Sequence, residues 1–236
     1  MIYRQPGYDI ICEWGQEGLE QLGPTADAII IVDVFSFCTC VDVATANGAV
    51  IYPFPYNDES AQAFADEKKA LLAGENEYGY ELSPASLLTI PERTRLVLPS
   101  MNGSALSSLI GDEAPTFAGC LRNARAVAIA ARQFGRRVAV IPAGERWRHS
   151  RTMRPALEDW LGAGAVVSYL SGNLSPEAEA AAAAFEHARH HLVDALARTA
   201  SGQELFEHDM ADTIDIAAAL NHSAAAPRLI GGAYIA

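Results

Sequence analysis

Asp33 is the first residue placed to do chemistry, because it directly follows the most apolar run of the chain, residues 28–32. A β-branched run of this kind predicts a strand buried on both faces of a parallel sheet. Ligands of such sheets bind beyond the carboxyl ends of the strands. A carboxylate there is a suitable Mg²⁺ ligand, since Mg²⁺ takes carboxylate oxygens and keeps several waters. The alternative role of Asp33 is to cap the helix expected after it.

Two further segments follow expected strands and could bind an anion. Asn102-Gly103-Ser104 stands between an expected strand and a helix, where Gly103 permits close backbone approach and Ser104 adds a hydroxyl donor. Asn123 opens a helix after another expected strand. Both segments are candidates for contact with a phosphate, and the alternatives are an ordinary turn with a serine cap and an asparagine N-cap.

The fourth segment combines acids with arginines. Gly144-Glu145 is followed by four arginines within nine residues, and Asp159 comes shortly afterwards. Guanidinium groups match the oxygens of phosphate or sulfonate, so Arg146 and Arg148 are candidate substrate-binding residues. Carboxylates and arginines at one edge of a sheet suit metal-assisted phosphoryl chemistry. The alternative is a charged loop that only faces solvent.

Composition and motifs exclude several other classes. The chain has 236 residues and a net charge of −12, with Lys68 and Lys69 its only lysines, which argues against binding nucleic acid or anionic membranes. No apolar run reaches the roughly 18–20 residues of a membrane span. The four cysteines read as reduced core residues. A P-loop, a GxSxG elbow and the Cys-based and aspartyl phosphatase motifs are absent from the sequence.

Strands and helices are expected to alternate along the chain. The expected strands are 8–14, 28–32, 49–52, 95–98, 116–118, 137–141 and 228–235. The expected helices are 39–46, 59–72, 103–110, 123–134, 155–170, 176–199 and 212–220. Residues 74–91 are expected to form a long functional loop or a loop with one short helix, and residues 142–149 a loop. This alternation predicts an α/β fold whose sheet is covered on both faces. We expect one domain over residues 1–236, with a helical C-terminal subregion at about 176–222.

Taken together, these segments resemble the 2-phosphosulfolactate phosphatase family, Mg²⁺-dependent enzymes of coenzyme M biosynthesis and related sulfolactate metabolism. The resemblance runs from about residue 28 to the C-terminus. The segments that carry it are 32–39, Gly74-Glu75-Asn76, 80–84, 101–105, 123–127, 143–145, 158–164 and 209–227. It implies a three-layer α/β/α sandwich with a largely parallel or mixed sheet, and hydrolysis of 2-phospho-3-sulfolactate to 3-sulfolactate.

The resemblance also implies roles for individual residues. Asp33, Glu145 and Asp159 are the implied catalytic groups, and Asp33, Glu75 and Asp159 the implied metal ligands. The implied substrate contacts are Asn102, Gly103, Ser104 and Asn123, to which the arginine segment adds Arg146 and Arg148. We expect a cytoplasmic protein with a small anionic phosphorylated substrate, and a homodimer is one expectation.

This chain departs from the family pattern at three positions. Ser36, Asn76 and Ala105 stand where the family carries arginine. Each loss removes Coulomb attraction for an anionic substrate. One hypothesis is that the arginines at 146–154 compensate from another loop. The alternative is a paralogue that binds a different small anion or does not turn it over.

Overall fold

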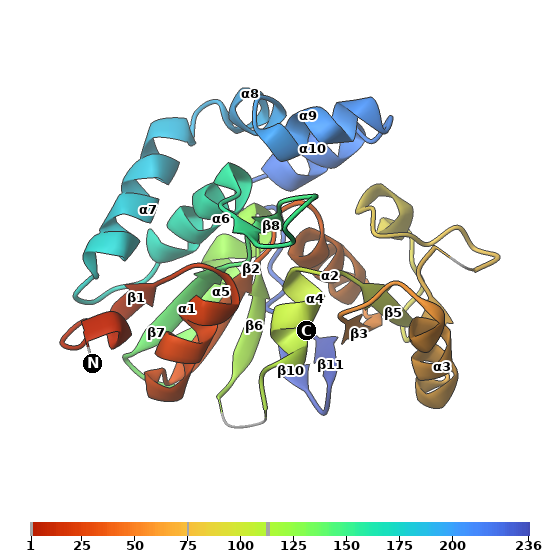
Figure 1. The fold of residues 1–236 in the computed structure, drawn as a ribbon, viewed down its shortest axis with the longest axis horizontal. Coiled ribbons are helices and arrows are strands. Elements are labelled where there is room, and N and C mark those ends of the chain that lie inside the picture. Colours follow the sequence, from red (N-terminus) through yellow and green to blue (C-terminus); the bar gives the residue numbers. More distant parts are fainter. Residues whose placement is uncertain (1, 75, 112–113) are drawn as a thin grey trace.

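The computed structural model describes residues 2–74, 76–111 and 114–236, and a large mixed sheet runs through it (Figure 1). The strands of this sheet are β1 (Ile10–Cys12), β2 (Ala28–Val32), β3 (Val50–Phe54), β4 (Leu71–Leu72), β5 (Arg95–Pro99), β6 (Thr116–Gly119), β7 (Val138–Pro142), β10 (Arg228–Ile230) and β11 (Ala233–Ile235). Their order is β1-β7-β2-β6-β10-β11-β3-β5-β4. A separate two-stranded hairpin is formed by β8 (Glu145–Arg146) and β9 (Met153–Arg154).

The sheet consists of two parallel groups joined by an antiparallel hairpin. β1, β7, β2 and β6 run parallel to one another, and so do β3, β5 and β4. The hairpin β10–β11 lies between the groups and pairs antiparallel with β6 on one side and β3 on the other. The group containing β3 therefore runs opposite to the group containing β2. The expected final strand 228–235 is thus two strands, which turn at Gly231 and Gly232 with positive φ.

Helices cover both faces of the sheet, as expected for a three-layer α/β/α sandwich (Figure 1). The helices are α1 (Gly15–Leu22), α2 (Phe37–Ala46), α3 (Glu59–Lys68), α4 (Gly103–Ser108), α5 (Ala124–Ala131), α6 (Leu157–Val167), α7 (Pro176–Ala188), α8 (Leu192–Ala197), α9 (Ala200–Glu207) and α10 (Asp212–Ala218). One core packs α1, α2 and α4 on the sheet, a second packs α5, α6 and α7 on the other face, and α3 covers the outer strands.

β2 is buried along its whole length, which confirms the prediction from its apolar run. Ile29 and Ile31 face the core with α2, whereas Ile30 and Val32 face the core with α6. Alternate side chains of a strand point to opposite faces, so a strand with helices on both sides must be apolar throughout. Asp33 is therefore carried to the end of a fully buried strand.

The C-terminal helices depart from the expected pattern. The alanine-rich segment 176–199 is not one helix, because α7 ends at Ala188 and α8 begins at Leu192. α9 and α1 were not expected, and the expected helix 59–72 ends at Lys68, with Leu71–Leu72 forming edge strand β4. Within the described residues no helix is both long enough and apolar enough to cross a membrane. All four cysteines are buried and free, as the sequence predicts.

Candidate active site

The Asp33 carboxylate joins the starts of two helices. Asp33 is 3 % exposed, and its Oδ1 accepts a hydrogen bond of 3.1 Å from the N–H of Phe37, the first residue of α2. Its Oδ2 accepts a bond of 2.8 Å from the N–H of Gly103, the first residue of α4. Although β5 runs opposite to β2, the segment after β5 thus reaches the carboxyl end of β2. The expected helix contact of Asp33 is present, and a carboxylate oxygen with one such bond can still accept another ligand.

Gly103 must be glycine because of this approach. A Cβ atom built on Gly103 would lie 2.7 Å from Asp33 Oδ2 and would overlap the ring of Phe37. Gly103 is a predicted substrate contact for its close backbone approach, and in the structure its N–H donates to Asp33. Gly103 therefore contributes by positioning the Asp33 carboxylate.

Asp159 joins the segment after β2 to a third segment, the one that follows β7. It lies in the first turn of α6 and is 3 % exposed. Its Oδ1 accepts a hydrogen bond of 2.7 Å from the N–H of Val34, and its Oδ2 accepts one of 2.9 Å from the N–H of Gly144. The Asp159 carboxylate thereby binds the neighbour of Asp33 and the neighbour of Glu145 at the same time.

Glu145 and Asn102 are also brought together. Asn102 Nδ2 donates to Glu145 Oε1 at 2.8 Å, and the N–H of Arg146 donates to the same oxygen at 2.8 Å. Both residues are partly exposed, unlike the aspartates beneath them. Four of the predicted site residues therefore lie together: Asp33, Asn102, Glu145 and Asp159. Asn102 and Glu145 are hydrogen-bonded to each other, and the two aspartates are hydrogen-bonded to residues next to one of these four in the sequence.

The two aspartates lie in an acidic environment. Burial raises the pKa of Asp33 to about 7, and the charges of Glu145 and Glu158 add to this, against the hydrogen bonds from Gly103 and Phe37. Burial also raises the pKa of Asp159 well above its usual value, helped by the charge of Asp33. Within the described residues no lysine or arginine nitrogen lies within 4.0 Å of either carboxylate. This buried acidic pair therefore has no cationic partner among the described residues.

Two predicted substrate contacts, Ser104 and Asn123, form hydrogen bonds within their own turns. Ser104 is fully buried, and its hydroxyl donates to the carbonyl of Leu98 at 2.7 Å. Asn123 is fully buried as well, accepting from the N–H of Cys120 at 2.8 Å and donating to the carbonyl of Ala118 at 3.1 Å. Each polar side chain stabilises the turn that joins its own strand and helix. Neither presents a free polar group at the surface of the site.

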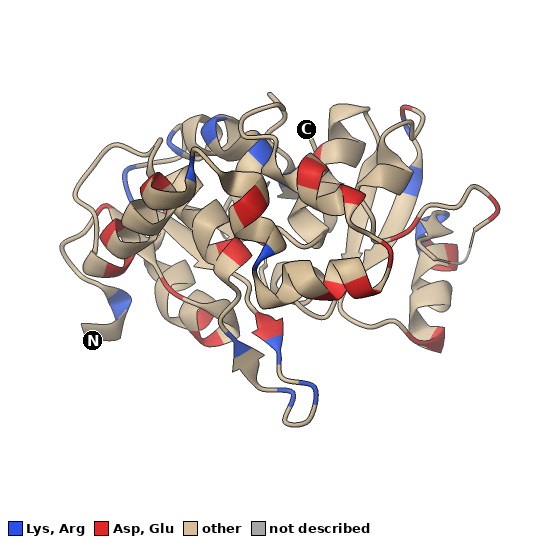
Figure 2. Ribbon diagram, turned by 90° about the horizontal axis from the view of Figure 1, so that it is seen from above, with Lys and Arg blue, Asp and Glu red and all other residues tan. Residues whose placement is uncertain are grey.

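The arginine segment forms the hairpin β8–β9, which projects from the body of the molecule (Figure 2). The guanidinium of Arg146 donates to the Met101 carbonyl through Nε and Nη2, at 3.2 and 3.1 Å, and so holds the hairpin beside Asn102. Arg148 points away and pairs with Glu204 of α9 at 3.1 Å. Of the two predicted arginines, Arg146 therefore lies next to the site, whereas Arg148 contacts the helical subregion.

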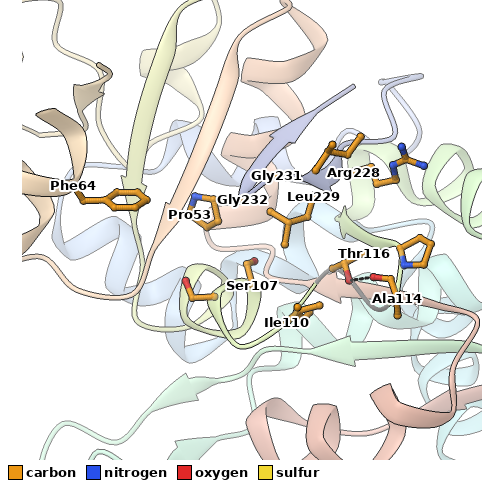
Figure 3. A pocket seen from close by; sticks show the side chains of 14 residues that line it. Pro53, Phe64, Ser107, Ile110, Ala114, Thr116, Arg228, Leu229, Gly231 and Gly232 are labelled. Atoms are coloured by element: carbon orange, nitrogen blue, oxygen red, sulfur yellow. Dashed lines mark hydrogen bonds between the residues drawn. The ribbon is translucent and has the colours of Figure 1, made fainter. Parts of the chain in front are cut away.

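A separate hollow of about 520 Å³ lies at the other edge of the sheet (Figure 3). Thr116, at the start of β6, lines it together with Pro53, Phe64 and Leu229. Because β6 is parallel to β2, the start of β6 is at the edge opposite to Asp33. No residue predicted for the site lines this hollow.

The amino-acid sequence is similar to that of known proteins. The sequence model of the family described as 2-phosphosulpholactate phosphatase matches residues 16–232. The chain belongs to this family. It is 29% identical over 182 residues to the 2-phosphosulfolactate phosphatase of Methanothermobacter thermautotrophicus, with 75% of each chain covered. It is 31% identical over 206 residues to the probable 2-phosphosulfolactate phosphatase of Carboxydothermus hydrogenoformans, covering 82% of each.

A third relative extends the coverage. The probable 2-phosphosulfolactate phosphatase of Gloeobacter violaceus is 29% identical over 215 residues, covering 86% of this chain and 89% of the relative. Each of the three relatives is thus matched over at least three quarters of this 2-phosphosulpholactate phosphatase family member.

Ser36, Asn76 and Ala105, which stand where the resemblance leads us to expect arginine, have different surroundings in this family member. Ser36 is buried. Asn76 organises its own loop: its amide donates to the carbonyls of Leu72 and Tyr80, and its carbonyl oxygen accepts from two N–H groups. Ala105 lines a hollow that is also lined by Arg146. Glu75, a predicted metal ligand, lies outside the described residues.

Glu158 is a further acidic residue of the site that sequence reasoning did not select. It is 3 % exposed, burial raises its pKa, and its charge raises the pKa of both Asp33 and Asp159. Its Oε2 has no hydrogen-bond partner among the described residues. An acid in the first turn of a helix is common because it complements the helix dipole, so the sequence carries no distinctive signal for this role.

The donor set of the site is compatible with Mg²⁺. Asp33 and Asp159 offer carboxylate oxygens, and Mg²⁺ is usually held by one or two carboxylates, with water and substrate phosphate completing its shell. A buried acidic pair without a cationic side chain is an environment that a divalent cation would stabilise. No three His, Cys, Asp or Glu side chains of the described residues are grouped closely enough to hold one metal ion by themselves.

Proposed function

We propose that this chain is a Mg²⁺-dependent phosphatase that hydrolyses 2-phosphosulfolactate to sulfolactate and phosphate. The observation that carries the proposal is the buried pair Asp33 and Asp159, which has no cationic partner among the described residues and lies where the segments after β2, β5 and β7 meet. Membership of a family whose relatives carry this activity in their names supports it.

Asp33 and Asp159 would hold the metal. Bound there, Mg²⁺ would supply charge neutralisation of the phosphate and a lowered pKa of water. The protein contributes rigidity, because each carboxylate oxygen is already oriented by one backbone N–H. Oxygens fixed in this way need little rearrangement when a ligand arrives.

In this proposal Glu145 moves the proton. Its Oε1 is fixed by Asn102 Nδ2 and by the N–H of Arg146, which leaves Oε2 to accept a proton from the attacking water. The water oxygen forms the new bond to phosphorus while the bond from phosphorus to the C2 oxygen of the substrate breaks. The leaving C2 oxygen takes up a proton from solvent to give the hydroxyl of sulfolactate, and Glu145 returns its own proton to solvent. Asn102 acts as a positioning residue in this scheme, since it orients Glu145.

A non-catalytic or altered-specificity anion-binding paralogue is the second candidate. One observation favours it: all four oxygens of Asp33 and Asp159 accept backbone hydrogen bonds, so the aspartates already have structural roles. Such a protein would keep the small anionic ligand and lose turnover. We also propose, for either candidate function, that the protein is cytoplasmic and forms a homodimer; cell fractionation and the mass in solution would test these two points.

Phosphate release separates the two candidates. The folded protein would be assayed with 2-phosphosulfolactate and with an aryl phosphate, in Mg²⁺ and in EDTA. The phosphatase proposal predicts turnover of 2-phosphosulfolactate that EDTA abolishes and Mg²⁺ restores. Absence of turnover with both substrates in the folded, Mg²⁺-supplied protein would reject it. A Mg²⁺-dependent rise in melting temperature that Asp33→Asn removes would support the metal assignment independently of activity.

A further inference from the structure

A hollow of about 630 Å³ opens beside the candidate active site. α4, residues 55–56 and the β8–β9 hairpin form its walls, and its lining includes Tyr56, Met101, Ala105, Leu109, Arg146 and Arg151. Met101 precedes Asn102, which donates to Glu145, and Arg146 follows Glu145. The hollow therefore adjoins the residues placed around the reacting phosphate.

This hollow is cationic in a chain of net charge −12. Arg146 and Arg151 line it, and its described lining residues include no acid. No carboxylate oxygen of the described residues lies within 4.0 Å of either guanidinium, whereas Arg122, Arg136 and Arg148 each pair with one. Two arginines without carboxylate partners beside an apolar wall form an environment suited to an anion.

The hairpin fixes the backbone of Arg151. Its N–H donates to the Trp147 carbonyl at 2.9 Å, and its own carbonyl accepts from Arg146 Nη1 at 3.2 Å. Its φ of 59° is the left-handed conformation of a tight turn. Its Nη1 lies 3.8 Å from Met101 Sδ on the wall of the hollow. Arg146 is occupied with main-chain carbonyls, so Arg151 is the arginine more available to a ligand.

We propose that this hollow receives the sulfonate of 2-phosphosulfolactate and that Arg151 determines specificity for it. The inference rests on the proposed function. In this substrate the phosphate and the carboxylate share carbon C2, and the sulfonate is on C3, so the sulfonate extends furthest from the reacting centre. A sulfonate offers three oxygens to a planar guanidinium, and both groups are weakly hydrated, which suits a wall of Met101 and Leu109.

Two variants and two substrates test the assignment. Arg151→Gln removes the charge, and Arg148→Gln is the matched control, because Arg148 is on the same hairpin but pairs with Glu204. The substrates are 2-phosphosulfolactate and 2-phospholactate, which differ only in the sulfonate. We expect Arg151→Gln to raise KM for 2-phosphosulfolactate by about tenfold, the loss of one charge-assisted hydrogen bond, with kcat nearly unchanged. KM for 2-phospholactate should stay within about twofold, as should both KM values of Arg148→Gln.

The inference would be overturned if Arg151→Gln and Arg148→Gln behaved alike, or if Arg151→Gln impaired both substrates equally. Calorimetric titration with 3-sulfolactate tests sulfonate binding in the hollow independently of turnover. Wild-type protein should bind it, and Arg151→Gln should weaken binding by about tenfold. Binding that depends on Arg151 in a protein without turnover would reject the phosphatase proposal and keep the sulfonate subsite. Wild-type protein that does not bind 3-sulfolactate would reject the subsite.

Discussion

Asp159 accepts a hydrogen bond of 2.7 Å from the backbone N–H of Val34, across 125 positions of sequence. Its other carboxylate oxygen accepts from the N–H of Gly144 at 2.9 Å. One buried side chain thus fixes the segment that carries Asp33 against the segment that carries Glu145. The architecture of the site and the stability of the fold are therefore linked, and substitutions at this junction should affect both.

Asp159→Asn should lower the free energy of unfolding by about 1–3 kcal/mol, because the new amide NH₂ would face one of the two backbone N–H donors. Urea denaturation measures this change, and phosphate release measures the accompanying loss of activity. Asp209→Asn is the control, since Asp209 is exposed and has a positive φ that asparagine tolerates. An unchanged urea midpoint for Asp159→Asn would contradict the role assigned to this carboxylate.

Gly103→Ala should destabilise the protein by about 1–3 kcal/mol through overpacking, because the new methyl group would press on Asp33 and Phe37. Activity should fall with it, since the Asp33 carboxylate has to move. Gly111→Ala serves as the comparison, because a Cβ there has no described neighbour within 4 Å. Equal urea midpoints for the two variants would show that the close approach at Gly103 is unimportant.

The contribution of Asp33 to the stability of the metal-free protein should fall as the pH rises from about 4 to about 7. The pKa of Asp33 is about 7 in the folded protein, against 3.8 for an ordinary aspartate. In this interval the native state holds a proton that the unfolded state has released, so raising the pH favours unfolding. This stabilisation is complete below about pH 4 and is lost as the pH rises through about 7.

Urea midpoints in EDTA at several pH values measure this effect as the difference between wild type and Asp33→Asn. The difference should shrink or reverse as the pH rises, because the variant has no group to titrate at position 33. Parallel curves would rule out a raised pKa at Asp33. Added Mg²⁺ should stabilise the wild type more at pH 8 than at pH 5, since protons compete with the metal for the carboxylates.

Arg122→Leu should cost about 3–5 kcal/mol of stability, because it leaves a buried carboxylate without its cation. Arg122 Nε lies 2.9 Å from Asp42 Oδ2, and the Asp42 side chain is fully buried. Arg136→Leu removes the same charge from an exposed pair with Asp9 and should cost no more than about 1 kcal/mol. Similar losses in the two variants, measured by urea denaturation, would contradict the importance of burial for the inner pair.

Local sequence patterns predict an element correctly where burial alone determines its secondary structure. The run 28–32 predicts β2 and thereby the position of Asp33, because only a strand covered on both faces is apolar at every residue. The break between α7 and α8 could not be predicted in this way. Alanine-rich sequence has high helix propensity throughout, and segment 176–199 has no glycine or internal proline to end a helix.

Side-chain partners were harder to predict than strands. Ser104 and Asn123 have the residue types of anion contacts, but their partners are nearby main-chain groups of their own turns. Which group a short polar side chain meets depends on backbone geometry that its sequence neighbours do not determine. The reversed direction of β3, β5 and β4 follows from a hairpin more than 100 residues away in sequence. The periodicity of apolar residues within a segment does not predict which distant strand it pairs with.

The position of the β10–β11 hairpin has a consequence for biosynthesis. Its residues follow all the other strands in the chain, yet they lie between β6 and β3. Until residues 228–235 have emerged from the ribosome, any sheet that the nascent chain has formed lacks this hairpin, which leaves β6 and β3 without their partner strands. Such edges can pair with other chains, so the period between their synthesis and the arrival of the hairpin is when a molecular chaperone would protect this protein most.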